Sequence, residues 1–392
     1  MSESAEILLQ LLRAALGNEG ARLEGLDLGS VSGEVWKEVI DLSFEQGVAA
    51  IAVDGLQRGF AHDNDDDNQE GLEFSLDSPE LEDLKYEWFG EVFAREEDYG
   101  QQTEAIRKLV KLWSAAGLDT FALKGLAYGL YYPVPEHRYS CDFDCNVRRA
   151  DGSPAWAEAD RIARENGIEV DGSMNKHSRF VVRGPHSLRQ AQGKLGSGQV
   201  PVENHRSIVA VNGSRKDKRF DAYLQGSLCA SEKSLLSDVK LYSPCWLFNA
   251  LFCVAHARTH FIEEEGITLK HVLDWVLIRR APEAASCREQ FEKDIDRFGL
   301  RKFFDALDGV GDVLELRAES LDLREEGVRL MLEAILAPKD VRHYKSKFLA
   351  HLNILRMLWA NRWKYRHYSD SNAFATMWGY IYGIFFDNDL PR

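Results

Sequence analysis

The chain lacks a run of apolar residues long enough to span a membrane, and none of its cysteines forms a Cys-x-x-Cys pair. Its six cysteines are scattered, which is typical of reduced and mostly buried thiols. Residues 1–17 carry two glutamates and lack the basic start and cleavage site of a signal peptide. We therefore expect a cytoplasmic protein with no membrane partner.

The chain also has no excess of basic residues. It contains 48 lysines and arginines against 63 acidic residues, and its formal net charge is −15. This balance argues against broad electrostatic binding to DNA, although a local basic surface is compatible with it. The glycine spacing of a P-loop or a dinucleotide-binding turn is absent too. The hydrophobic fraction of 45% is enough for two or three globular domains in 392 residues.

The most informative stretch covers residues 121–147. It opens with an apolar run, residues 121–123, which meets Lys124 and Gly125 and passes into a helix-like segment. A short apolar run, a glycine and a helical pattern predict a strand, a turn and a helix.

The second half of this stretch, residues 140–147, alternates apolar and polar side chains. Such alternation predicts a half-buried strand, with Asp142 and Asp144 on its open face. Two carboxylates placed in this way lie about 7 Å apart along the strand and repel each other unless a cation joins them. Hard oxygen ligands suit Mg²⁺, which also binds phosphate oxygens. The alternative is the solvated face of an edge strand.

These residues carry a family resemblance. The stretch resembles the bacterial "uncharacterised nucleotidyltransferase" family, a branch of the DNA polymerase beta-like nucleotidyltransferase superfamily. The similarity lies in residues 123–125, the Tyr-Pro pair at 132–133, Arg138 and the Asp-x-Asp motif at 142–144. It continues more weakly to about residue 280.

The resemblance implies that cations near the turn bind a triphosphate. Lys124 stands where the strand ends, so its charge and the backbone N–H groups of Gly125 and Leu126 could meet the phosphates. In the wider superfamily this helix opens with Gly-Gly or Gly-Ser, so Lys124 and Gly125 are a departure. Arg138 could hold another phosphate oxygen. The alternative for either cation is a salt bridge to a nearby acid.

Two-metal nucleotidyl transfer also needs a third carboxylate, usually from a separate strand. Glu203 is our candidate, and His205 lies two residues further on and therefore on the same face of a strand. In the resembling family an acidic residue followed two positions later by histidine occurs at about this point, and we place His205 among the nucleotide-binding residues. Asp221 is the rival carboxylate. For either acid, the alternative is an ordinary polar residue on an exposed face.

A helical pattern begins near residue 243 and places His256 and His260 four residues apart. With His271 or Asp274 they could bind zinc. No glutamate follows His256 as in the zinc protease motif, and apolar helices often bury a hydrogen-bonded histidine, so zinc is not the expected cofactor. A third option is that these histidines face the nucleotide or its acceptor.

Two polar segments have simpler interpretations. Residues 62–68 contain contiguous aspartates without the spaced ligands of a calcium loop, which predicts an acidic loop. Glycines and basic residues in 183–199 predict a plain connection rather than a phosphate lid. The other expected elements are helices at 5–16, 36–56, 79–92, 104–116 and 154–166, and strands at 168–170, 180–182 and 200–206.

We therefore predict an α+β fold in which a small mixed β-sheet forms a nucleotidyltransferase core at residues 101–240. A helical N-terminal region, residues 1–100, and a helical C-terminal domain, residues 241–392, flank this core.

The implied function is metal-dependent transfer of an NMP group from an NTP to an acceptor hydroxyl, with release of pyrophosphate. Asp142, Asp144 and Glu203 would hold two Mg²⁺ ions, and the acceptor would be a small molecule, an RNA end or a protein. The alternative is a catalytically silent nucleotidyltransferase-like module that binds a nucleotide or a partner protein.

Overall fold

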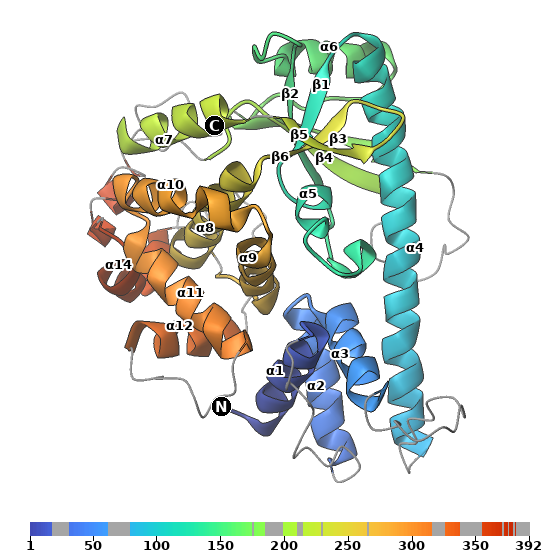
Figure 1. The fold of residues 1–392 in the computed structure, drawn as a ribbon, viewed down its shortest axis with the longest axis vertical. Coiled ribbons are helices and arrows are strands. Elements are labelled where there is room, and N and C mark those ends of the chain that lie inside the picture. Colours follow the sequence, from blue (N-terminus) through green and yellow to red (C-terminus); the bar gives the residue numbers. More distant parts are fainter. Residues whose placement is uncertain are drawn as a thin grey trace.

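The computed structural model describes residues 1–17, 31–61, 79–174, 176–184, 199–209, 215–228, 230–264, 266–315, 326–337, 355–370, 372–374, 376–378 and 381. The acidic loop expected at 62–68 and most of the connection expected at 183–199 lie outside these residues. Figure 1 shows a β-sheet at one end of the molecule, a small group of N-terminal helices at the other, and C-terminal helices beside both.

Six strands of the described chain form one mixed sheet in the order β3-β4-β2-β1-β6-β5. β2 runs parallel to β4 and β1 parallel to β6, whereas the other neighbours are antiparallel. The α+β fold with a mixed sheet is confirmed. The strands are β1 (Asp119–Ala122), β2 (Phe143–Arg148), β3 (His177–Arg183), β4 (Gln199–His205), β5 (Ala230–Leu236) and β6 (Leu241–Pro244).

Strand β2 differs from the half-buried strand that its alternation predicted, because all six of its residues are buried. It lies in the interior of the sheet between β1 and β4. Its polar side chains are buried with partners: Asp144 contacts His205, and the Asn146 amide donates to the His205 carbonyl oxygen at 3.0 Å. The alternation therefore separates an apolar face from a face of paired polar groups, and neither face is open to water.

A single helix, α4 (Pro79–Ala115), replaces the two helices expected at 79–92 and 104–116. It contacts α2 (Gly33–Glu45) and α3 (Ala49–Ala61) and also reaches β1, β3 and β4, so it connects the N-terminal helices to the sheet (Figure 1). The intervening residues are mostly Glu, Gln, Arg and Ala, which are strong helix formers. The helix therefore runs through the boundary that we placed after residue 100.

Elsewhere the predicted elements need three changes. The helix expected at 36–56 is broken into α2 and α3 at Gly47, whose φ of +68° ends a helix readily. Residues 168–170 form no strand, and only an isolated bridge joins Asp171 to Arg179. The sheet extends past residue 240, since β6 ends at Pro244.

The remaining helices comprise α1 (Glu3–Ala15), which packs against α2 and α3, and further helices that lie beside the sheet or form the C-terminal part. The further helices are α5 (Leu126–Gly129), the short 3₁₀ helix η2 (Pro135–His137), α6 (Trp156–Glu165), α7 (Arg215–Ser227), α8 (Trp246–Glu263), α9 (Leu269–Arg280), α10 (Ala284–Arg297), α11 (Arg301–Glu315), α12 (Glu326–Leu336) and α14 (Arg362–Tyr368). The helix expected at 154–166 is confirmed as α6.

One hydrophobic core runs through all three predicted regions. Trp36, Trp113 and Trp275, one from each region, are among its most completely buried side chains. The indole N–H of Trp113 donates to the Ala159 carbonyl oxygen at 3.0 Å and joins α4 to α6. The domain limits stay predictions, because the core is continuous across them.

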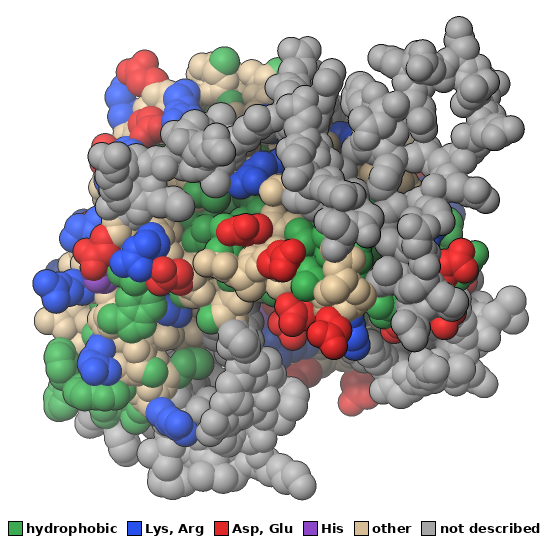
Figure 2. Space-filling view, turned by 90° about the horizontal axis from the view of Figure 1, so that it is seen from below, with side chains coloured by type: hydrophobic (Ala, Val, Ile, Leu, Met, Phe, Trp, Pro, Cys, Tyr) green, Lys and Arg blue, Asp and Glu red, His purple; other side chains and the backbone are tan. Residues whose placement is uncertain are grey.

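Within the described residues, no helix has both the length and the apolar composition that crossing a bilayer requires. Figure 2 shows the molecule from below the view of Figure 1, so that the lower end of the molecule faces the reader. Acidic and basic side chains are interspersed on the described part of this face. The described side chains on this face therefore form no continuous basic area for a nucleic-acid backbone.

Candidate functional site

The site begins at the turn after β1. Gly125 has φ +52° and ψ −109°, a conformation that L side chains rarely adopt. An added Cβ would also lie 3.1 Å from Ser140 Oγ, which itself donates to the Asp142 carbonyl oxygen at 3.1 Å. The turn thus packs against the start of β2. It brings Lys124 Nζ to 2.8 Å from Asp144 Oδ2.

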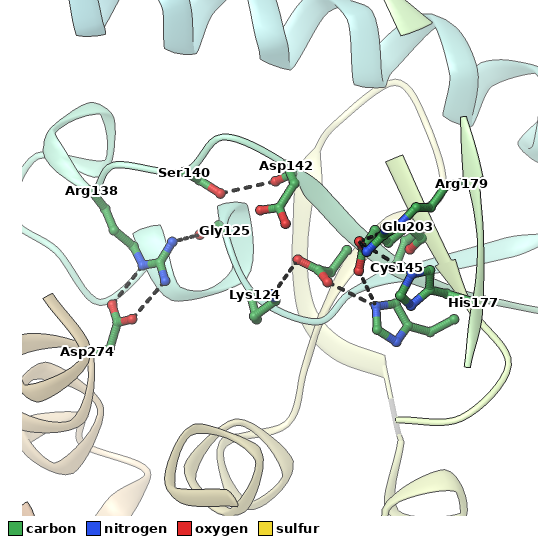
Figure 3. Close-up of polar contacts among 12 residues, drawn as sticks. Lys124, Gly125, Arg138, Ser140, Asp142, Cys145, His177, Arg179, Glu203 and Asp274 are labelled. Carbon is green, nitrogen blue, oxygen red and sulfur yellow. Dashed lines mark hydrogen bonds and ion pairs between the residues drawn. The ribbon is translucent and has the colours of Figure 1, made fainter. Parts of the chain in front are cut away.

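Three carboxylates meet beside this turn. Asp144 is the register partner of Glu203 across the parallel pair β2 and β4, and Asp142 immediately precedes β2. One oxygen from each of Asp142, Asp144 and Glu203 lies within 4.8 Å of the others. We refer to these three residues as the carboxylate cluster, and Figure 3 labels two of them, Asp142 and Glu203. The structure brings together the acids that the sequence singled out, while their metal-binding role stays a prediction.

Asp144 is the most enclosed member of the carboxylate cluster, with a side chain 2% exposed. Its Oδ1 lies 2.9 Å from His205 Nε2, and its Oδ2 contacts Lys124. Burial alone would raise the pKa of Asp144, but Lys124 and His205 together lower it well below its usual range. The pKa of Lys124 is lowered by burial and raised more by Asp144 and Asp142, so the net shift is upward. This buried pair is therefore ionised at neutral pH.

The other two carboxylates have opposite pKa shifts. Burial and the charge of Asp144 raise the pKa of Asp142. Burial would also raise the pKa of Glu203, but its interaction with His205 and the nearby His177 bring it down to about 2. Three acids so close together carry an excess of negative charge that repels phosphate. A divalent cation would remove this repulsion.

Two residues of β3 that the sequence argument missed also contact Glu203. In the antiparallel register of β3 and β4, Arg179 pairs with Glu203 and His177 with His205. Arg179 Nη2 and Nε lie 2.9 and 3.0 Å from Glu203 Oε1, and His177 Nε2 lies 3.4 Å from the same oxygen. Only the pairing of the two strands reveals these neighbours.

Two further amines were also missed. Lys176 and Lys270 are partly buried, and in the described part of the chain neither Nζ has a carboxylate within ion-pair distance. Burial and the charge of Lys124 lower the pKa of Lys176, while burial and Arg138 lower the pKa of Lys270. The charge of Lys270 also acts on Asp142. Both amines therefore lie in the electrostatic field of the carboxylate cluster.

Arg138 forms the salt bridge that the sequence allowed as an alternative to phosphate binding. Its Nε and Nη2 lie 2.7 and 2.8 Å from the two carboxylate oxygens of Asp274, and Nη1 is 3.5 Å from the Gly125 carbonyl oxygen. Figure 3 shows this pair on the opposite side of Gly125 from Glu203. The bidentate pair supports the Gly125 turn on the side away from Glu203. Phosphate binding by Arg138 stays a prediction.

Asp221, the rival candidate for the third acid, binds backbone N–H groups instead. Its Oδ1 accepts hydrogen bonds from the backbone N–H groups of Ile208 and Val209, at 2.6 and 3.1 Å. These bonds anchor the segment that follows β4. Asp221 is not one of the ligand atoms that converge with Asp142 and Asp144.

The helical histidines form a ring cluster. The His256 ring lies 4.3 Å from that of His260 and 6.2 Å from that of His271, centre to centre. However, His271 caps α9 together with Thr268, and Asp274 is bonded to Arg138. Two groups of described residues bring three metal-ligating atoms within 4.8 Å, and neither contains these histidines. The structure therefore does not assemble the zinc ligands considered from the sequence.

Comparison with known families now adds to this geometry. The profile of the uncharacterised nucleotidyltransferase family matches residues 32–307, which is more than half of the chain. The chain belongs to this family. The match contains every candidate residue of the site and supports a nucleotidyl transfer role for this nucleotidyltransferase-family protein. The resemblance to the uncharacterised nucleotidyltransferase family, inferred from residues 123–144, is thereby confirmed. Neither a search of the curated proteins nor one of the solved structures found a match.

Proposed function

We propose that this protein is a metal-dependent nucleotidyltransferase that moves an NMP group from an NTP to an acceptor hydroxyl and releases pyrophosphate. The observation that carries the proposal is the convergence of Asp142, Asp144 and Glu203 beside Lys124, inside the region that the family profile matches. Asp144 lies in β2, Asp142 immediately precedes that strand, and Glu203 comes from its parallel neighbour β4.

The donor atoms of the carboxylate cluster fit a hard divalent cation. All three ligands are carboxylate oxygens, and they already lie within 4.8 Å of one another. Oxygen donors of this kind suit Mg²⁺, which also takes phosphate oxygens as ligands. When bound, such cations would neutralise the triphosphate and favour loss of the acceptor hydroxyl proton.

The cations of the chain itself would bind and orient the polyphosphate. Lys124 stands at the Gly125 turn, where its amine can reach both Asp144 and a phosphate oxygen. Lys176 and Lys270 add two amines that no described carboxylate neutralises within ion-pair distance, and Arg179 adds an exposed guanidinium beside Glu203. Phosphoryl chemistry of this kind consists mainly of positioning and charge stabilisation.

The decisive experiment measures NTP binding and pyrophosphate release by the purified full chain, for each of the four NTPs, with and without Mg²⁺. The variant is Asp142→Asn combined with Asp144→Asn, and the matched control is Asp41→Asn, an exposed acid on α2. We expect metal-dependent binding of at least one NTP, pyrophosphate release with an acceptor present, and at least a roughly tenfold weaker binding in the double variant, because losing one good charged contact costs about 1.4 kcal/mol or more.

Two outcomes would overturn the catalytic proposal. The first is a folded wild-type chain that binds no NTP, or a double variant that binds as tightly as wild type. The second is metal-dependent binding without pyrophosphate release when small hydroxyl compounds, RNA ends and proteins are each offered as acceptors. The second result would favour the silent nucleotide-binding module.

A further inference from the structure

A second group of ligating atoms lies against the carboxylate cluster. One ligand atom from each of His177, Glu203 and His205 lies within 4.8 Å of the others. We refer to these three residues as the imidazole cluster. His177 and His205 are register partners across β3 and β4, and Glu203 projects on the same side of β4 as His205. Both histidines are buried, with 4% and 1% of their surface exposed.

Within the described part of the chain, the ring of His177 makes no hydrogen bond. Both Nδ1 and Nε2 are buried, and neither has a hydrogen-bond partner in the described structure. The carboxylate oxygen Glu203 Oε1 is 3.4 Å from Nε2. A buried polar group without a partner costs free energy, and most such groups in folded proteins are satisfied by protein, water or an ion. His177 therefore presents a nitrogen that a ligand can use.

His205 faces hydrogen-bond acceptors on both sides of its ring. Nδ1 lies 3.1 Å from the Ser207 carbonyl oxygen, while Nε2 lies 2.9 Å from Asp144 Oδ1 and 3.6 Å from Glu203 Oε2. A neutral imidazole has one N–H, so it can donate on one side alone. If Nδ1 donates to Ser207, the lone pair of Nε2 points toward two carboxylates.

This arrangement is the one that metal-binding histidines adopt. Such residues usually donate their second N–H to a carbonyl or carboxylate oxygen, which fixes the tautomer and aims the other nitrogen at the metal. In His205 the Ser207 carbonyl oxygen, 3.1 Å from Nδ1, lies where it can accept that second N–H. A cation next to Nε2 would replace the hydrogen bond between His205 and Asp144 with a coordination bond.

We propose that the imidazole cluster is a transition-metal site that binds one divalent cation through nitrogen atoms of His177 and His205 and an oxygen of Glu203. Two imidazoles and one carboxylate suit Zn²⁺, Mn²⁺ or Fe²⁺, whereas Mg²⁺ prefers oxygen ligands. Arg179 already contacts Glu203 Oε1 twice, so Oε2, the oxygen facing His205, is the one that binds the cation.

Glu203 belongs to both clusters, so the two sites share one ligand residue. The imidazole cluster nevertheless does not depend on nucleotidyl transfer, because its argument uses the contacts of His177, His205 and Glu203 and no property of a nucleotide. If both sites bind metal, the protein holds one cation among oxygen ligands and one with nitrogen ligands, joined through Glu203.

The test uses the full chain stripped with a chelator and reloaded with Mn²⁺ in the presence of excess Mg²⁺, without nucleotide. Bound Mn²⁺ is counted by elemental analysis, and pulsed electron paramagnetic resonance detects coupling of its electrons to ¹⁴N of coordinated imidazole. The variants are His177→Gln and Asp142→Asn, and His367→Gln on α14 is the matched control. Circular dichroism shows whether each variant folds.

We expect one Mn²⁺ with ¹⁴N coupling in the wild type, in His367→Gln and in Asp142→Asn. The last result would support the imidazole cluster whether or not this protein transfers nucleotides. In folded His177→Gln we expect at least a roughly tenfold weaker affinity, because one ligand is lost. Should His177→Gln not fold, Zn²⁺ binding to the wild type provides the second measurement, with an increase in melting temperature expected.

Three results would overturn the site. One is a folded wild-type chain that binds neither Mn²⁺ nor Zn²⁺, which would leave His205 as a structural residue hydrogen-bonded between Asp144 and Ser207. Another is bound Mn²⁺ without ¹⁴N coupling, which would place the ion at the carboxylate cluster. The third is unchanged coupling in His177→Gln.

Discussion

Arg138 and Asp274 form a buried bidentate ion pair that connects the segment between η2 and β2 to helix α9. The side chains are 5% and 4% exposed, and the Tyr132 hydroxyl donates to Asp274 Oδ1 at 2.8 Å. Burial would lower the pKa of Arg138, but Asp274 raises it, so the guanidinium stays charged. The pair fixes the turn at Gly125 against the C-terminal helices.

Removing one partner of this pair should therefore destabilise the fold. We expect Arg138→Met to lower the free energy of unfolding by about 3 kcal/mol, because it leaves the Asp274 carboxylate buried without its cation. Urea denaturation measures the change. The matched control is Arg161→Met, whose pair with Glu165 is more than half exposed and is worth less than about 1 kcal/mol. A loss of NTP affinity with unchanged stability would instead assign Arg138 to phosphate binding.

His137 predicts a pH dependence of stability. It contacts Asp54 Oδ2 at 2.8 Å and Glu96 Oε1 at 2.9 Å, so η2 is joined to α3 and α4. Burial lowers its pKa, but these two acids raise it more, and the net shift is upward from the ordinary value of 6.5. A raised folded-state pKa stabilises the protein below the unfolded-state pKa, and this stabilisation disappears as the pH rises through the folded-state pKa.

His137→Gln should consequently lower the free energy of unfolding relative to wild type. This loss should be larger at about pH 5.5 than at about pH 8.5. We expect a difference of about 1 kcal/mol at the lower pH, since solvent reaches Glu96, whose side chain is 40% exposed. Denaturation at both pH values measures it. An equal effect at both would show that His137 acts through packing and not through its charge.

Gly55 marks a close approach of two N-terminal helices, α1 and α3. A Cβ at this position would lie 1.8 Å from the Leu11 carbonyl oxygen, so α1 and α3 are in backbone contact there. Gly55→Ala should lower the free energy of unfolding by about 2 kcal/mol or more, since the backbone of α1 must move. Thermal or urea denaturation measures the loss.

Gly90→Ala is the matched control, because Gly90 also lies inside a helix but has no atom within 4 Å of an added Cβ. That substitution should stabilise the protein by about 0.5 to 1 kcal/mol through helix propensity alone. If Gly55→Ala were also stabilising, the inference that the backbones of α1 and α3 are in contact at Gly55 would be wrong.

Much of the carboxylate cluster could be predicted because its geometry is local. Residues two apart in a strand project to the same side, so Asp142 and Asp144 follow from spacing alone. The same rule places Glu203 next to His205. The turn is equally local, because Gly125 adopts a positive φ that other residues rarely accept.

The contacts between strands could not be predicted in this way. Whether Arg179 or a neighbour faces Glu203 depends on the register of β3 and β4, and a shift by one residue would turn every side chain to the other face. The same limit applies to β2: its alternation shows that its two faces differ, while its position between β1 and β4 decides that both are buried.

The sequence alone therefore predicts the family motif, the α+β class and the pair Asp142 and Asp144, since these follow from patterns that are local along the chain, while the meeting of Glu203 with that pair depends on the pairing of β2 with β4. Tertiary structure decides that Arg138 is bonded to Asp274, that Lys176 and Lys270 lie near the acids, and that His177 meets Glu203 and His205. These neighbours come from segments far apart in sequence, and only the packing of the whole core specifies which of them meet.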